Sequence, residues 1–270
     1  MLTDIAAYDW LAFGALLFVA QLLAREFGYW LGRRRGETGK QEQDGVGLLV
    51  GGMLGVLGFV LALTLSFSTT RFSDRRDGTL AEANAIGTAW LRAEALGHPR
   101  SFEIARLLQD YTRVRIAYLE APLEPGALQA INQRTGALQT EIWGHLAALV
   151  RERQDPATVS LMTALNETFD MSTAERFAYE YRLPAQLIWL LLVMALITMA
   201  ALGYQLGLRG SGALRGPSLL LIAMWTVIIL TILDLAAARL GSIRTNTSAL
   251  VWTLEGFQPR ISIPPLPPPR

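Results

Sequence analysis

Four long apolar runs alternate with polar segments along this chain of 270 residues. They cover residues 10–23 with further apolar positions to 31, then 46–67, 184–208 and 217–233. A helix needs about 20 apolar residues to cross the hydrocarbon core of a bilayer, and its backbone polar groups are then satisfied within the segment. The pattern predicts four membrane-spanning helices, the first of which is interrupted by Arg25 and Glu26.

Residues 71–183 are polar, and their apolar positions recur at three- and four-residue steps with few strand signals. The Gly97-His98-Pro99 run is expected to end one helix, and Ser101 is expected to cap the next. Further helices are expected over about 127–153 and 156–182. The predicted fold is therefore an all-α polytopic membrane protein with four transmembrane helices and a helical extramembrane domain inserted between spans two and three.

These patterns divide the chain into four parts. They are spans one and two with a basic short connection (1–70), the helical extramembrane domain (71–183), spans three and four (184–238), and a proline-rich C-terminal tail (239–270). No helix breaker separates span two from the polar block. We expect either a helix of some 52 residues that forms a tall stalk, or a bend near residues 66–71.

Composition excludes several classes of protein. Hydrophobic residues make up 51% and charged residues 17%, against about 25% charged in a typical soluble domain. The net charge of +1 gives no field for nucleic acid. The absence of cysteine excludes disulfides and thiolate catalysis. His98 and His145 are expected to be surface residues. No nucleotide-binding or catalytic motif lies in a usable context. We therefore predict no enzyme activity, cofactor or metal.

Basic residues suggest an orientation. The short connections 25–44 and 208–216 carry seven basic residues in 29 positions, whereas the opposite side has seven over roughly twice that length. The density favours short loops in the cytoplasm, with the 71–183 domain and both termini outside.

Span two carries a ridge of small residues made by Gly47, Gly51 and Gly55, with Gly58 nearby. Such a ridge lets another helix approach closely. Close packing is important in a membrane because lipid supplies no hydrophobic drive for helix association. The ridge has two interpretations, which are packing among the four spans of one chain and the lining of an oligomer axis.

The end of span two is rich in hydroxyl groups and is followed by an arginine. Hydroxyls there can donate back to the helix backbone, or they can line a wet path that a cationic mouth opens to anions. An apolar constriction would precede this polar vestibule. The candidate pore-lining residues are Phe59, Leu63, Thr64, Ser66, Phe67, Ser68, Thr70 and Arg71.

Polar residues on the following helix give no catalytic pair. Glu82 and Asn84 point to different faces, and with Arg92 they are expected to form a salt-bridged helix surface. Asp234 ends span four and is either a plain edge carboxylate or a functional ionisable group.

The Arg71-Phe72 pair followed by Glu82-Ala83-Asn84-Ala85-Ile86-Gly87 and Arg92 resembles the signature of the bestrophin-like family of bacterial membrane proteins. After span four, Asp234, Arg239 and Gly241 look like matching positions, whereas three alanines stand at 236–238 where the family has polar residues. The resemblance covers nearly the whole chain and implies a multi-pass protein of the bacterial inner membrane with two spans, a helical domain and two spans.

The family is named for bestrophins, which are pentameric anion channels whose second span lines the pore neck. The resemblance implies a homo-oligomer, and it implies a cytosolic helical domain, opposite to the orientation that charge density favours. The predicted function is an oligomeric channel-like protein that passes small anions along span two. The alternative is a non-conducting membrane scaffold or sensor whose helical domain binds a partner. The predicted partners are the lipid bilayer, other copies of the chain and small anions, without nucleic acid.

Overall fold

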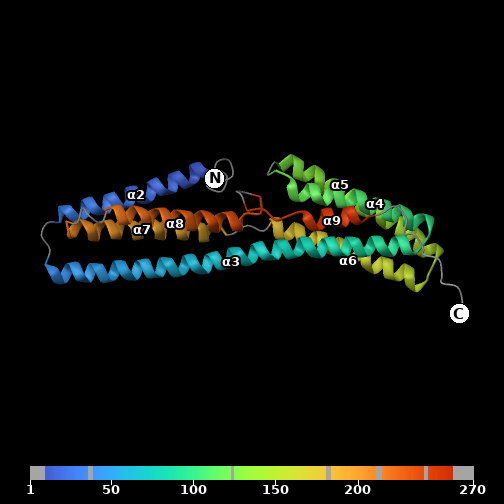
Figure 1. The fold of residues 1–270 in the computed structure, drawn as a ribbon, viewed down its shortest axis with the longest axis horizontal. Helices are drawn as coiled ribbons and strands as arrows, with labels where there is room; N and C mark the ends of the chain where they lie inside the picture. Colours follow the sequence, from blue (N-terminus) through green and yellow to red (C-terminus); the bar gives the residue numbers. More distant parts are fainter. Residues whose placement is uncertain are drawn as a thin grey trace, which may run out of the picture. The chain divides into compact units, whose positions relative to one another are not determined.

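The computed structural model describes residues 10–35, 39–122, 125–180, 184–210, 215–239 and 243–257, which contain helices and no strand (Figure 1). The all-helical prediction is confirmed. In chain order the helices are α2 (Trp10–Arg34), α3 (Lys40–Ala95), α4 (Pro99–Glu120), α5 (Pro125–Glu152), α6 (Pro156–Glu180), α7 (Ala185–Leu208), α8 (Arg215–Ala236) and α9 (Ser248–Gly256).

Four helical stretches of the described chain are long and apolar enough to cross a membrane. They include α2, α3, α7 and α8, in which the predicted apolar runs fall. α2 continues through Arg25 and Glu26 rather than ending before them. α3 remains helical across residues 66–71, where a bend was one of the two expectations.

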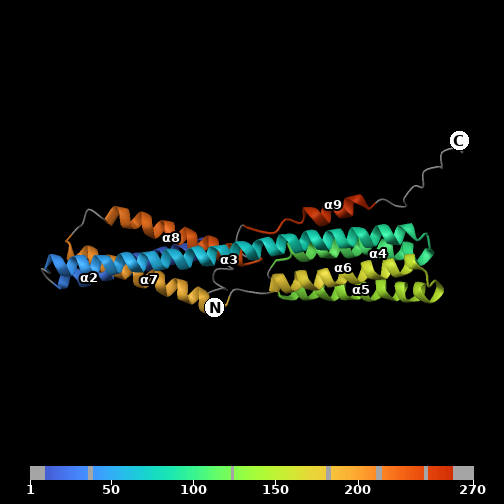
Figure 2. The same ribbon diagram turned by 90° about the horizontal axis from the view of Figure 1, so that it is seen from below.

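The chain forms two compact units. The first unit comprises Met1–Phe72 and Arg182–Arg244, and the second comprises Ser73–Tyr181 and Thr245–Arg270. In the first unit α2 packs against α7 and α8. In the rotated view α7 and α8 lie on opposite sides of the α3 ribbon (Figure 2). α3 contributes Leu57 and Leu61 to an apolar core shared with these helices, whose other members include Phe13, Leu17, Leu191, Met199, Trp225 and Ile229.

Two pairs of glycines let α2 and α7 touch backbone to backbone. A Cβ atom at Gly28 or at Gly203 would collide with a backbone carbonyl oxygen of the facing helix. Gly32 and Gly207 repeat this contact one turn further along. Close approach through small residues is the usual way in which membrane helices gain packing energy.

Polar side chains of α2 face α8 inside the first unit. The Arg25 guanidinium is 4% exposed and donates from Nη1 to the Ser218 hydroxyl at 2.5 Å, and it also pairs with Glu26. Gln21 Nε2 donates to Thr226 Oγ1 at 2.9 Å. These partners explain why charged and polar residues do not end the first apolar helix.

In the second unit side-chain hydrogen bonds join the last part of α3 to α4 and α6. α4 packs against α5 and α9, and α5 packs against α6. The Trp90 ring of α3 stacks on Phe257 after α9 with centroids 4.8 Å apart. Thr253 Oγ1 of α9 lies 3.4 Å from the Ala83 carbonyl oxygen, to which it donates. The C-terminal residues up to 257 therefore belong to this unit, and the proline-rich end of the tail lies outside the described residues.

His98, and not Ser101, is the N-cap of α4, so the expected cap is wrong. The His98 ring accepts from the backbone N–H of Arg100, and the His98 N–H donates to the Ser101 hydroxyl. The two residues thus satisfy each other's helix-end groups, as in a capping box. Arg100 and the His98 ring both approach Glu152 at the end of α5, at 2.7 and 3.3 Å.

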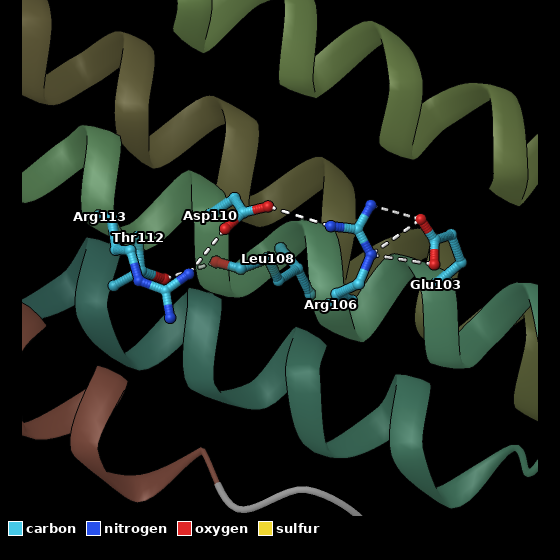
Figure 3. Close-up of polar contacts among 6 residues, drawn as sticks. All are labelled: Glu103, Arg106, Leu108, Asp110, Thr112 and Arg113. Atoms are coloured by element: carbon cyan, nitrogen blue, oxygen red, sulfur yellow. Dashed lines mark hydrogen bonds and ion pairs between the residues drawn. The ribbon is translucent and has the colours of Figure 1, made fainter.

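The outer face of α4 carries a ladder of alternating charges (Figure 3). Arg106 lies between Glu103 and Asp110, and Asp110 also accepts from Arg113 at 2.6 Å. Pairs at this helical spacing stabilise a helix by about 0.2–0.5 kcal/mol each in water. Such a solvated surface contrasts with the exposed apolar side chains of the first unit.

Candidate functional site

The exposed face of α3 within the first unit is largely apolar and follows the predicted lining. Phe59, Leu63 and Phe67 are 64%, 55% and 44% exposed, and Ser66 and Thr70 are exposed as well. They recur at three- and four-residue steps, so they share one stripe of the helix. This part of the chain thus presents bulky apolar rings followed by hydroxyls.

Several hydroxyls at the end of this stripe donate to the helix backbone. Thr64 donates to the Val60 carbonyl at 2.7 Å, and Thr70 donates to the Ser66 carbonyl at 3.1 Å. Thr69 makes the same bond to the Leu65 carbonyl. Each bond uses the hydroxyl hydrogen and leaves the oxygen lone pairs outward.

Two other predicted residues lie differently from the exposed stripe. Ser68 is fully buried within the chain, so the structure does not bring it to the face that carries Phe59 and Leu63. Arg71 is half-buried, and its guanidinium carbon lies 5.3 Å from the centre of the Phe67 ring. The cation is therefore drawn back over the last aromatic ring of the stripe.

The glycine ridge of α3 divides into two parts. A Cβ at Gly47 would lie 2.9 Å from Gln205 Nε2 of α7, so this glycine serves packing within the chain. At Gly51, Gly55 and Gly58 a Cβ would have no atom of the described chain within 4 Å. These three glycines form an exposed stripe of bare backbone on the surface of the first unit.

A separate, buried polar cluster lies in the second unit. Glu82 and Arg115 are 0% and 1% exposed, and Arg115 donates to both carboxylate oxygens at 2.5 and 3.1 Å. Burial alone would lower the pKa of Arg115, but the charge and hydrogen bonds of Glu82 raise it. The expectation of a surface salt bridge is wrong for Glu82, because its partner is 33 residues away on another helix.

Glu175 of α6 joins this cluster beside Gly78 and Thr79 of α3. Its Oε1 accepts from the Thr79 hydroxyl at 2.5 Å, while Oε2 is buried without a hydrogen-bond partner among the described residues. A Cβ at Gly78 would overlap Oε2, so only glycine leaves room for the carboxyl group. Burial and then the nearby charge of Glu82 raise the pKa of Glu175 to about 7.

The other residues of the family signature have structural roles in the second unit. Ile86 is fully buried in the core and Asn84 is exposed, and a Cβ at Gly87 would lie 3.6 Å from the Thr253 methyl group of α9. Arg92 donates from Nη1 to the Ser160 carbonyl at 2.8 Å and so ties α3 to α6.

At the end of α8, Asp234 is 4% exposed and accepts from the Ile243 backbone N–H at 3.3 Å. It is therefore a buried group that fixes the chain after the helix. Arg239 is half-buried, and Gly241 lies outside the described residues. No group of three or more histidine, aspartate or glutamate side chains that could hold a metal occurs within the described ranges.

A family model for the bestrophin-like domain matches residues 16–250. The chain belongs to the bestrophin-like family. The bestrophin-like chain also resembles two crystal structures in fold. A membrane protein with a proline-to-alanine substitution gives a TM-score of 0.63 at 14% identity, covering 92% of this chain and 96% of that one. A bacterial bestrophin homologue from Klebsiella pneumoniae with a tyrosine-to-alanine substitution gives 0.59 at 15% identity, covering 92% and 97%.

No curated protein matches this bestrophin-like sequence. The resemblance inferred from the Glu82–Gly87 run is thus confirmed at the level of the family. Two residues beside the signature residue Glu82 were not predicted from the sequence. Arg115 pairs with Glu82, and Glu175 lies near enough to feel its charge. The only signal for Arg115 was its position on the apolar stripe of its helix, where a fully charged side chain needs a partner.

Proposed function

We propose that this protein is an oligomeric ion-channel-like membrane protein in which the exposed face of α3 lines a path for small anions. One observation carries the proposal. In the apolar 18-residue stretch of α3 that could cross a membrane, only 17% is buried within the described chain. The corresponding stretches of α2 and α8 are 33% and 39% buried. The helix with the least cover is the one that gains most from packing against other copies.

Membrane location and topology form part of the proposal. α2, residues 46–67 of α3, α7 and α8 cross the bacterial inner membrane, and residues 71–183 form a helical domain outside the lipid. Residues 239–270 form the C-terminal tail. Leu11, Leu48 and Leu220 are 74–83% exposed in the first unit, and large exposed apolar areas of this kind mark contact with lipid or protein.

The proposed lining consists of Phe59, Leu63, Thr64, Ser66, Phe67, Thr70 and Arg71, without the buried Ser68. Around an oligomer axis the aromatic and leucine rings would form an apolar constriction, which can gate by excluding water. Gly51, Gly55 and Gly58 would let neighbouring copies of α3 approach closely. The Arg71 cation after the last ring favours anions over cations.

The proposal is tested by anion flux into liposomes that contain the purified protein and an anion-quenched dye. We expect flux in the wild type and severalfold faster flux in Phe59→Ala, because the substitution widens an apolar constriction. Leu220→Ala, which removes an equally exposed side chain from α8, serves as the matched control and leaves flux unchanged. Absence of flux, flux that Phe59→Ala does not change, or a strict monomer in detergent contradicts the channel.

A second function, a non-conducting scaffold or sensor, is favoured by the back-bonded hydroxyls of Thr64, Thr69 and Thr70. Their hydrogens are engaged by the backbone, so they offer acceptors and not donors to a passing anion. An oligomer without flux would support this second function.

A further inference from the structure

The ends of α2 and α7 border an open surface cavity outside the proposed ion path. Its volume is about 550 Å³, and it is lined by Leu31, Arg34, Arg35 and Tyr204. All four residues belong to the first unit. The Arg35 guanidinium donates from Nη1 to the Tyr204 hydroxyl at 2.9 Å, which fixes one cation at the cavity wall.

The backbone holds this cavity rigidly. Gly32 of α2 lies against the Tyr204 carbonyl, and Gly207 of α7 lies against the Tyr29 carbonyl, in both cases without room for a Cβ. The helices cannot move apart or slide at this level without losing those contacts. The cavity is therefore formed before any ligand arrives, which lowers the entropy cost of binding.

Positive charge is concentrated around the cavity. Arg33 and Arg34 lie in the last turn of α2, Arg35 follows it, and Arg209 follows α7. Two exposed carboxylates offset part of this charge: Glu42 is 3.6 Å from Arg35 and Asp44 is 3.8 Å from Arg209. The helix C-termini add only about half a negative charge each, so a net positive charge remains.

An aromatic surface adjoins the cationic one. Phe27 and Trp30 stack with ring centroids 6.0 Å apart, and both are exposed, at 62% and 46%. The Arg34 guanidinium carbon lies 3.8 Å from the centre of the Trp30 ring. Leu31, which follows Trp30 in the sequence, is also 46% exposed. Exposed aromatic rings one turn from arginines are typical of the boundary between lipid and water.

We propose that this cavity binds the headgroup of an anionic phospholipid. Arg34 and Arg35 hold the phosphate, and the acyl chains lie along Leu31, Trp30 and Phe27. A free anion would use only the cations, whereas a lipid also covers the exposed apolar rings beside them. The inference rests on α2 crossing the membrane, as proposed above, and does not depend on ion conduction.

The test is native mass spectrometry of the full chain in a neutral detergent, titrated with phosphatidylglycerol or phosphatidylcholine. We expect the first phosphatidylglycerol to bind at least tenfold more tightly than phosphatidylcholine. In the Arg34→Gln/Arg35→Gln double variant we expect this preference to be lost, since each basic residue near a membrane surface contributes about fivefold and the two together account for a tenfold preference. Arg106→Gln/Arg113→Gln removes the same charge from α4 and keeps the preference.

Three results overturn the proposal. They are equal binding of the two lipids to the wild type, an unchanged preference in the Arg34/Arg35 double variant, and displacement of the lipid by inorganic phosphate at the same concentration, which would identify a site for a free anion. The wild-type comparison does not require any variant to fold. Liposome flux in the same preparation reports on the channel separately.

Discussion

In the first unit bare glycine backbones bring α2 and α7 into close contact, whereas in the second unit buried polar and charged side chains join α3 to α4 and α6. The outer surfaces of the two units also differ in polarity, and here the charged side chains are on the outside of the second unit. Bulky apolar side chains such as Leu220 and Phe59 are exposed in the first unit, and the α4 surface of the second carries Glu103, Arg106 and Asp110.

This difference follows from the two solvents that the proposed topology implies. Lipid solvates apolar side chains as well as a protein interior does, so helices in lipid gain stability by close backbone approach. In water, surface charges are well solvated and buried ones need partners. Substitutions in the interior of each unit test this difference.

The buried ion pair of the second unit gives the largest expected effect. Arg115→Met keeps most of the side-chain volume but leaves the Glu82 carboxylate buried without its cation. Breaking a buried pair in this way costs about 3–5 kcal/mol. We expect a marked fall in the thermal midpoint of the full chain in detergent, followed by helical circular dichroism.

A double variant, Glu82→Met/Arg115→Met, removes both charges and is the control for Arg115→Met. It should recover most of the lost stability, because an apolar pair of similar volume often replaces a buried ion pair without cost. If the double variant is as unstable as Arg115→Met, loss of packing rather than an uncompensated charge is responsible.

The glycine contact of the first unit comes next. Gly203→Ala places a Cβ on a carbonyl of α2, and overpacking of this kind costs about 1–3 kcal/mol even after helix propensity is counted. Gly144→Ala on α5 is the control, because this exposed helical glycine lies outside the proposed oligomer contact and a Cβ there has no neighbour within 4 Å in the described chain. Alanine there should leave the thermal midpoint unchanged or raise it. Equal losses in the two variants would contradict the distinction between closed and open glycines.

The third prediction concerns pH. In the folded chain the pKa of Glu175 is about 7, above its ordinary value of 4.5. Between about pH 4.5 and pH 7 the folded state therefore keeps a proton on Glu175 that the unfolded state has released. The stability contributed by the neutral carboxyl group is complete below about pH 4.5 and is lost as pH rises to about 7, with a total of about 3 kcal/mol.

Glu175→Gln keeps the size of the side chain and stays neutral, so this part of the pH dependence should disappear from it. The measurement is the difference between the thermal midpoints of the two proteins at pH 5 and pH 8, which removes contributions from other groups. An identical pH dependence in wild type and variant would contradict the raised pKa.

The apolar helices were predictable from the sequence because twenty consecutive apolar residues are a local property. The continuation of α2 through Arg25 was not, since the serine that accepts from it lies 193 residues away. The same limit applies to the Glu82–Arg115 pair, in which the charges are adjacent only after α3 and α4 pack.

The glycine patterns show what spacing can and cannot establish. The Gly28–Gly32 and Gly203–Gly207 pairs have the same four-residue spacing as Gly51–Gly55, but only the first two pairs meet another helix in the chain. Spacing indicates that a close contact is possible and does not identify the partner. His98 was misjudged for a related reason, because its role as N-cap depends on the geometry of one turn rather than on residue type.

The backbone contact between α2 and α7 also limits how this molecule can move. Glycines meeting carbonyl groups on two successive turns act like interlocked teeth, so neither helix can rotate about its own axis while the other stays in place. In any conformational change we expect these two helices to move together as one rigid pair. α3 meets them through apolar side chains such as Leu57 and Leu61 rather than through bare backbone, so we expect it to shift more easily than either.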